Sequence, residues 1–227
     1  RILILDSKPR GATLVERFAE SCRPNSKTIA QKVARTVEQG LGRSVRGEKD
    51  YCAVVLLGAD LVGSVRSADG RRFFSSQTQR QIEIGLDIAN LAGEDISEGA
   101  TPMDVFVGLL KQILARDDGW KEFYSEQMSG VSEEIVDKEL LAIFEVEAAS
   151  ASKAGQRRFR DAVQVLQNML DKNDLSESER GWYLQEMARL MGYTDRAEAR
   201  RLQASAYSAN RYLLRPADGV EIAKLEP

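Results

Sequence analysis

Two short runs of purely apolar residues restrict the fold of this chain more than any other feature of its sequence. The first covers residues 2–5 and ends at Asp6; the second covers residues 51–57 and is closed by Gly58. Strands without polar alternation are typical of parallel sheets covered on both faces. Helical periodicity fills the interval between the two runs. Strand, helices and strand in this order predict an α/β fold.

The two helices expected in that interval have different apolar patterns. Residues 13–21 place four apolar side chains on one face, and a second helix begins near Lys27 after a cap at Asn25 or Ser26. The apolar positions are Leu14, Val15, Phe18 and Ala19 in the first helix, and Ile29, Val33, Val37 and Leu41 in the second. Beyond the second strand we expect a short helix over residues 60–66, a turn at Asp69-Gly70, and a helix over residues 76–92 that ends at Gly93.

From residue 94 the pattern is helical throughout. Thr101-Pro102 is a strong helix start. Further helices are expected over residues 120–128, from 131 or 132 to about 155, over 159–170, after Ser176, and from Asp195 through residue 213. Residues 154–213 weakly resemble tetratricopeptide-type hairpins, but a non-repeating bundle of antiparallel helix pairs fits better. The sequence therefore predicts two domains, with α/β residues 1–95 followed by an all-α bundle over residues 96–227.

Charge and composition exclude several classes of protein. With 43% hydrophobic and 30% charged residues, the chain has the composition of a folded protein, and no apolar run is long enough to cross a membrane. No signal peptide is evident at the start, so we expect a cytoplasmic protein. The net charge of −3 is the sum of +3 over residues 1–95 and −6 over residues 96–227. An acidic total argues against a protein that coats nucleic acid, although a basic channel in the first half is compatible with it.

The content of histidine and cysteine excludes much catalytic chemistry. The chain contains no histidine and two cysteines, Cys22 and Cys52. Most zinc sites and all histidine-based triads are therefore excluded, and we expect both cysteines to be reduced, buried and structural. No metal site is expected within this sequence. Paired carboxylates such as Glu133-Glu134 are interpreted as charge at helix starts.

One segment, residues 39–50, has a pattern that points to chemistry. It contains Gln39, Gly42, Arg43 and Arg46 in the spacing Gln-x-x-Gly-Arg-x-x-Arg, between a helix and a buried strand. This pattern resembles motif VI of superfamily 2 DEAD/DEAH-type helicases, especially the XPD/DinG-like branch. The resemblance implies that residues 1–95 are the C-terminal part of a second RecA-like (P-loop NTPase) domain. It further implies an ATP-dependent helicase or translocase, a hydrolase that acts on DNA or RNA, with DNA the favoured substrate.

The resemblance assigns a role to each residue of the motif. Arg43 and Arg46 would be catalytic arginine fingers that stabilise the charge developing on the transferred phosphoryl group. Gln39 would hold a water or a phosphate oxygen, and Gly42 would leave the backbone bare beside the phosphates. The alternative without a catalytic role is a solvated helix face on which these arginines pair with Glu38, Glu48 and Asp50.

What the sequence lacks matters as much for the reaction. It contains no phosphate-binding loop and no acidic box, which in such helicases belong to the first motor domain. We therefore expect a longer protein that continues upstream, with that domain as the partner holding most of the ATP and Mg²⁺. The fragment alone should hydrolyse no ATP. The helical region resembles tails of bacterial helicases of this type and is a candidate site for a partner protein.

Two further basic segments are weaker candidates for contact with nucleic acid. Lys8 and Arg10 follow the first strand, where a RecA-like domain faces its nucleic acid, but loop cations are usually just solvated. Residues 71–74, Arg-Arg-Phe-Phe, resemble a stacking platform, although packing of both phenylalanines under the sheet is favoured.

Two other functions of the chain stay open. These are a non-catalytic interaction scaffold on a degenerate motor domain, and a nucleotide-binding switch that does not unwind.

Overall fold

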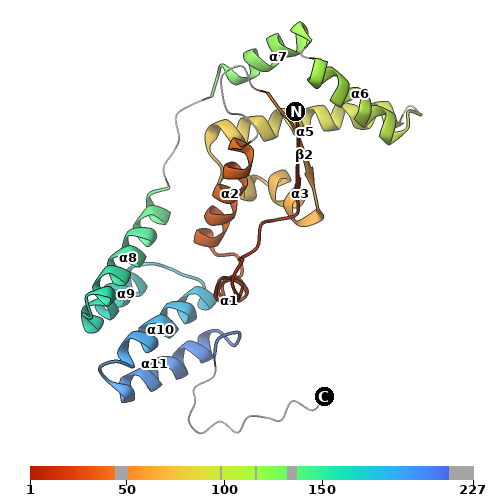
Figure 1. Cartoon of the computed structure of the whole chain (residues 1–227). Helices are drawn as coiled ribbons and strands as arrows, with labels where there is room; N and C mark the ends of the chain where they lie inside the picture. Colours follow the sequence, from red (N-terminus) through yellow and green to blue (C-terminus); the bar gives the residue numbers. More distant parts are fainter. Residues whose placement is uncertain (44–50, 98, 116, 132–136, 215–227) are drawn as a thin grey trace, which may run out of the picture. The chain divides into compact units, whose positions relative to one another are not determined.

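The computed structural model describes residues 1–43, 51–97, 99–115, 117–131 and 137–214. Over these residues the chain is mostly helical, with one two-stranded parallel sheet (Figure 1). It divides into two compact units. Unit 1 consists of Arg1–Arg10 and Ala30–Ile135, and unit 2 consists of Gly11–Ile29 and Val136–Pro227. These units cut the chain differently from the predicted α/β and all-α segments, because residues 11–29 pack with the C-terminal helices.

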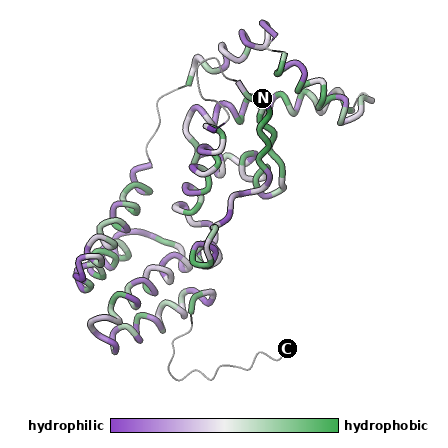
Figure 2. The backbone as a smooth tube through the Cα atoms, viewed as in Figure 1, coloured by the Kyte–Doolittle hydropathy of each residue, from purple (hydrophilic) through white to green (hydrophobic). Residues whose placement is uncertain are grey.

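The sheet of unit 1 is formed by the two apolar runs. Strand β1, Ile2–Asp6, pairs in parallel with β2, Ala53–Leu57, with Ile2 opposite Ala53 and Leu5 opposite Leu56. Both strands are hydrophobic along almost their whole length (Figure 2). The predicted strands are confirmed, although the second begins two residues later than the apolar run.

The core of unit 1 lies on one face of this sheet. Helix α2, Lys27–Gly42, and α3, Ala59–Arg66, pack there against Leu5 and Leu56. The buried side chains of this core are Ala34, Val37, Leu61, Val65 and Phe74. On the opposite face Ile2 is 49% exposed and Ile4 59% exposed. Ala53, opposite Ile2, is 3% exposed, so within the described residues this face is covered in part, and the expectation of a sheet covered on both faces is only partly met.

The remaining helices of unit 1 differ from the sequence expectations in two places. They are α4, Ala68–Arg71; α5, Ser76–Ser97; α6, Pro102–Ala115; and α7, Asp118–Met128. A helical turn capped by Ser67 replaces the open turn expected at Asp69-Gly70. Helix α5 runs through Gly93, because an interior glycine costs only about 1 kcal/mol and need not end a helix. The positive backbone angle φ of 112° falls instead at Gly99.

Unit 2 is built from helical hairpins. Helices α8, Lys138–Gly155, and α9, Phe159–Lys172, form one hairpin; α10, Glu177–Met191, and α11, Arg196–Ala209, form the next. Their shared core contains Leu166, Leu170, Tyr183 and Met187. Asp195 caps α11 as expected, but the helix ends at Ala209, where Asn210 is its C-cap. Residues 132–136, where an earlier start of α8 was expected, lie outside the described residues.

Helix α1, Leu14–Cys22, completes unit 2 with a face that differs from the expected one. Thr13 and Glu16 form a reciprocal capping box at its start. Leu14 and Val15 are exposed, whereas Phe18 and Cys22 pack with Trp182, Ala206 and Leu213. The Asn210 side chain donates to the Cys22 carbonyl at 2.6 Å. Residues 11–29 are thus held by helices nearly two hundred positions away in sequence.

A buried polar cluster fixes this contact. Arg23 is 7% exposed, and its guanidinium donates to Thr28 at 2.8 Å and to the Tyr183 hydroxyl at 3.0 Å. Glu147 and Glu179 each lie 3.5 Å from it and balance its charge. Burial raises the pKa of the Tyr183 hydroxyl far above its ordinary value, so this group stays protonated and donates to Glu147 at 2.7 Å.

Candidate functional site

The motif residues that the structure describes stand at the C-terminal end of helix α2. Gln39, Gly42 and Arg43 are all exposed, and the backbone N–H of Arg43 closes the last turn onto the Gly40 carbonyl at 3.2 Å. Arg46 lies outside the described residues. Glu48 and Asp50, two of the three partners considered for Arg43 in the solvated-face alternative, also lie outside the described residues, so that alternative stays open.

Helix α2 is held firmly on its inner side. Ala34 and Val37, three residues apart, are both buried against α3. The Gln31 side-chain amide donates to the Phe73 carbonyl at 3.0 Å. These contacts anchor the helix from its middle and leave its last turn exposed.

Glu38 anchors that last turn, and sequence reasoning missed its role. Its Oε1 accepts from the Ser75 backbone N–H at 2.8 Å and from the Ser75 hydroxyl at 2.7 Å. Ser75 directly precedes α5, so the carboxylate lies at a helix N-terminus, where negative charge is favoured. The only local signal was an acid beside Gln39, which we interpreted as surface charge. Glu38 is therefore a positioning residue for Gln39 and Arg43.

The surroundings of Gly42 show why a glycine is not needed there for folding. A Cβ added at Gly42 would meet no described atom within 4 Å, and its backbone φ is not positive. Gly40, in the same turn, would meet the Leu5 side chain at an ordinary 3.6 Å. Any requirement for a bare backbone at Gly42 must therefore come from a ligand or from another part of the protein.

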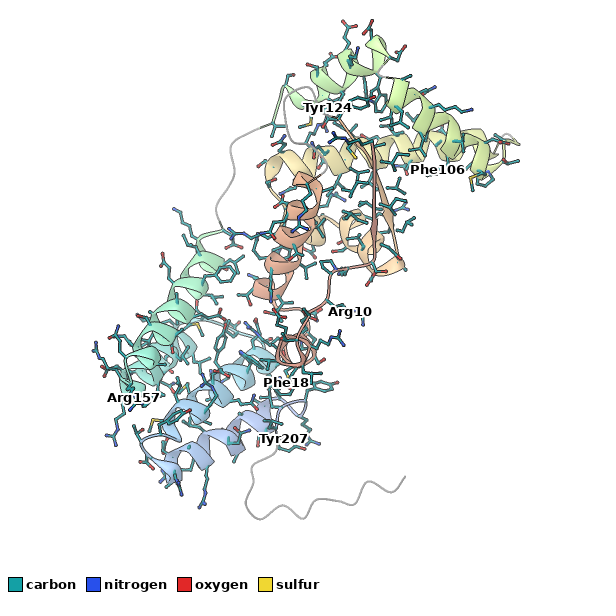
Figure 3. The ribbon with its side chains drawn as sticks, in the orientation of Figure 1. Arg10, Phe18, Phe106, Tyr124, Arg157 and Tyr207 are labelled. Carbon is teal, nitrogen blue, oxygen red and sulfur yellow. The ribbon has the colours of Figure 1, made fainter. Side chains whose placement is uncertain are left out.

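Lys8 and Arg10 lie at one edge of the sheet. They follow the carboxyl end of β1, and Arg10 is exposed on the segment that leaves the strand (Figure 3). Gln39 and Arg43 lie at the end of helix α2, in the turn where a Cβ at Gly40 would meet the Leu5 side chain of β1 at 3.6 Å.

The strand ends beside Lys8 are fixed by an unusual backbone approach. The Ser7 N–H donates to the Leu57 carbonyl at 3.0 Å, and Ser7 and Gly58 have positive φ angles of 66° and 85°. A Cβ at Gly58 would lie 2.6 Å from the Ser7 Oγ and 2.8 Å from its Cα. Glycine is thus required at position 58 for the two chains to come this close.

The Arg-Arg-Phe-Phe segment does not form a stacking platform. Phe74 is 6% exposed and belongs to the core of unit 1, and Phe73 packs against the same core. The Arg71 guanidinium donates to the carbonyls of Val65 and Arg66, while Arg72 lies 4.8 Å from the Phe73 ring centroid. The interpretation of these phenylalanines as packing residues is confirmed.

Cysteine and metal chemistry add no further site in the part of the chain that the structure describes. Cys22 is fully buried, and burial raises the pKa of its thiol; Cys52 is half-buried, and both are free thiols. No group of metal-ligating side chains is brought together among these residues. None of the described helices is long and apolar enough to cross a membrane.

No protein-family model, curated protein or solved structure matches the chain.

Proposed function

We propose that this chain is the C-terminal part of an ATP-dependent nucleic-acid helicase or translocase and supplies one half of a composite ATPase site. The observation that carries the proposal is the Gln-x-x-Gly-Arg-x-x-Arg pattern, which begins on the exposed end of helix α2 and precedes the parallel strand β2. In this proposal unit 1 derives from a second RecA-like domain. ATP and Mg²⁺ are held mainly by an upstream domain.

The chemistry expected at such a site needs two fixed positive charges. Transfer of the γ-phosphoryl group spreads negative charge over its equatorial oxygens, and guanidinium groups meet those oxygens with bidentate hydrogen bonds. Arg43 and Arg46 take this role, and Gln39 orients a water or a phosphate oxygen. Arginine fingers are worth roughly 10³–10⁵-fold in rate in other nucleotide hydrolases. The anchoring of α2 by Glu38 supports the proposal, because a finger contributes only when its backbone is fixed.

Hydrolysis of ATP by the intact protein, with and without single-stranded DNA, tests this function. We expect DNA-stimulated turnover that falls by roughly 10³-fold or more in Arg43→Ala and Arg46→Ala, with ATP binding largely kept. Arg35→Ala is the matched control, since Arg35 is an exposed arginine on the same helix. Gly42→Ala should lower turnover without lowering the stability of this chain. Turnover that survives Arg46→Ala unchanged would refute the assignment, as would hydrolysis by the isolated chain.

An interaction scaffold is the second candidate, and exposed apolar residues favour it. On α6, Met103 is 66% exposed and Phe106 41% exposed; on α5, Leu91 is 64% exposed. Apolar patches of this kind are typical of surfaces that other proteins cover. An intact protein without nucleotide turnover, whose Phe106→Glu variant loses a bound partner protein, would establish the scaffold instead.

A further inference from the structure

The tips of two helical hairpins in unit 2 lie side by side and bring a distinct set of residues together. Phe159 begins α9, and Tyr193 lies in the loop between α10 and α11; their rings stack at 4.6 Å with an angle of 14° between planes. Arg157, at the end of the α8–α9 hairpin, marks this tip in Figure 3. Residues 156–161 and 189–201 together are called the hairpin-tip patch below.

The hairpin-tip patch concentrates arginine in an otherwise acidic region. Its residues include seven arginines and three carboxylates, whereas the rest of residues 96–227 holds ten basic and twenty acidic side chains. The arginines come from both tips. Hydrogen bonds from the Glu198 and Ala197 amides lower the pKa of the Asp195 carboxyl, and the charges of Arg160 and Arg201 lower it further. Arg160 of α9 and Arg201 of α11 therefore both act on the Asp195 carboxyl.

The ion pairs within the patch are weak competitors for an outside anion. Arg158 pairs with Asp161 at 2.6 Å, and Arg201 pairs with Glu198 at 3.3 Å. Both pairs are exposed and lie within one helix, where such pairs contribute typically under 1 kcal/mol. Phosphate groups carried on a polymer can replace these partners and gain from several arginines at once.

The aromatic pair identifies the kind of polymer. Phe159 packs against the core of unit 2 and supports one face of the Tyr193 ring, while Tyr193 itself is 67% exposed. An exposed aromatic ring in an arginine-rich segment fits a nucleobase that is not already stacked in a duplex. An acidic peptide without aromatic side chains would use the arginines and leave the ring without a stacking partner.

We propose that the hairpin-tip patch binds single-stranded nucleic acid, with Tyr193 as the stacking platform and Arg157, Arg160 and Arg196 as phosphate contacts. This surface goes beyond the proposed function, which assigns roles only to the residues of the motif at the end of α2. Binding here needs neither ATP nor the motif at the end of α2. Failure of one proposal is therefore distinguishable from failure of the other.

Fluorescence anisotropy with a labelled single strand of about 15 nucleotides, at about 50 mM salt, tests the proposal on the 227-residue chain. We expect Tyr193→Ala to weaken binding by about 5- to 100-fold and Tyr193→Phe to restore it. Tyr212→Ala is the matched control, since Tyr212 is 73% exposed in the same unit. Thermal unfolding of each variant shows whether it folds.

The contribution of the patch arginines is measured by the salt dependence of binding. The combined Arg157→Ala, Arg160→Ala and Arg196→Ala variant should reduce the slope of log affinity against log salt by about 2, since three phosphate contacts are lost. Removing Lys111, Lys138 and Lys172, three exposed cations elsewhere, should change that slope much less. Unchanged affinity in both patch variants, or no binding by the wild type, would overturn the proposal. Equal affinity for polyglutamate, indifferent to Tyr193→Ala, would overturn it in favour of an acidic protein partner.

Discussion

Arg23 carries a positive charge into the interior of unit 2, and its effect on the stability of the unit depends on its neighbours. Its Nη2 atom lies within 3.5 Å of the carboxylates of Glu147 and Glu179 and of the hydroxyls of Tyr183 and Thr28. Its buried Nε has no partner among the described residues. Trp182 and Tyr183 also place their rings 5.6 and 5.2 Å from the guanidinium carbon. Such a group is costly to bury and more costly to remove alone, because removal leaves its carboxylates unpaired.

Replacement of Arg23 by alanine should therefore lower the free energy of unfolding of unit 2 by about 2–4 kcal/mol. This figure allows for Glu147, whose side chain is 32% exposed and partly solvated. Arg189→Ala breaks a surface pair with Glu186 and should cost less than about 1 kcal/mol. Urea denaturation followed by tryptophan fluorescence measures both variants, since Trp182 lies beside Arg23. Equal losses in the two variants would show that the cluster is not a stabilising centre.

At the scale of helices and strands, local sequence patterns predicted most element positions. Both strands, the start of α6 at Pro102 and the caps at Ser176 and Asp195 follow from signals within a few residues. The errors arise where distant contacts decide. Leu14 and Val15 have the periodicity of a buried face, but both are exposed. Helix α1 instead buries Phe18 and Cys22, because these side chains pack against Trp182 and Ala206.

The candidate site rests on a local pattern. Gln39, Gly42 and Arg43 were chosen from their spacing, and the structure describes these three on one exposed helix end. The role of Glu38 could not be predicted, because its partner Ser75 is 37 residues away. The hairpin-tip patch was missed for the same reason, since Phe159 and Tyr193 meet only through tertiary packing.

The close approach of Ser7 and Gly58 at the two strand ends can be tested by substitution of the glycine. Gly58→Ala introduces a Cβ at a φ of 85° and within 2.6–2.9 Å of three Ser7 atoms, so unit 1 should lose roughly 1–3 kcal/mol of stability. Gly63→Ala, inside α3, meets no described atom within 4 Å and should be neutral or stabilising by up to about 1 kcal/mol. Chemical denaturation of the two variants checks this difference; a tolerated Gly58→Ala would mean that the strand ends can separate.

At the scale of the whole chain, unit 2 is assembled from segments that are far apart in sequence. Deletion of residues 136–227 should therefore expose residues 11–29, whose Cys22 is now fully buried. We expect the Cys22 thiol to react with a maleimide or a disulfide reagent many times faster in the deletion variant than in the whole chain. Hydrogen exchange should lose protection over α1 in parallel. Unchanged reactivity of Cys22 would show that α1 is covered without the C-terminal helices.

The sheet of unit 1 has a consequence for anyone who purifies this chain. Its two strands each keep an unpaired outer edge among the described residues, and Ile2 and Ile4 lie bare beside them. Open backbone edges with apolar side chains act as templates for additional strands from other molecules. Self-association of the concentrated chain is then expected to run through these strand edges, and a stoichiometry measured at high concentration would reflect this edge pairing.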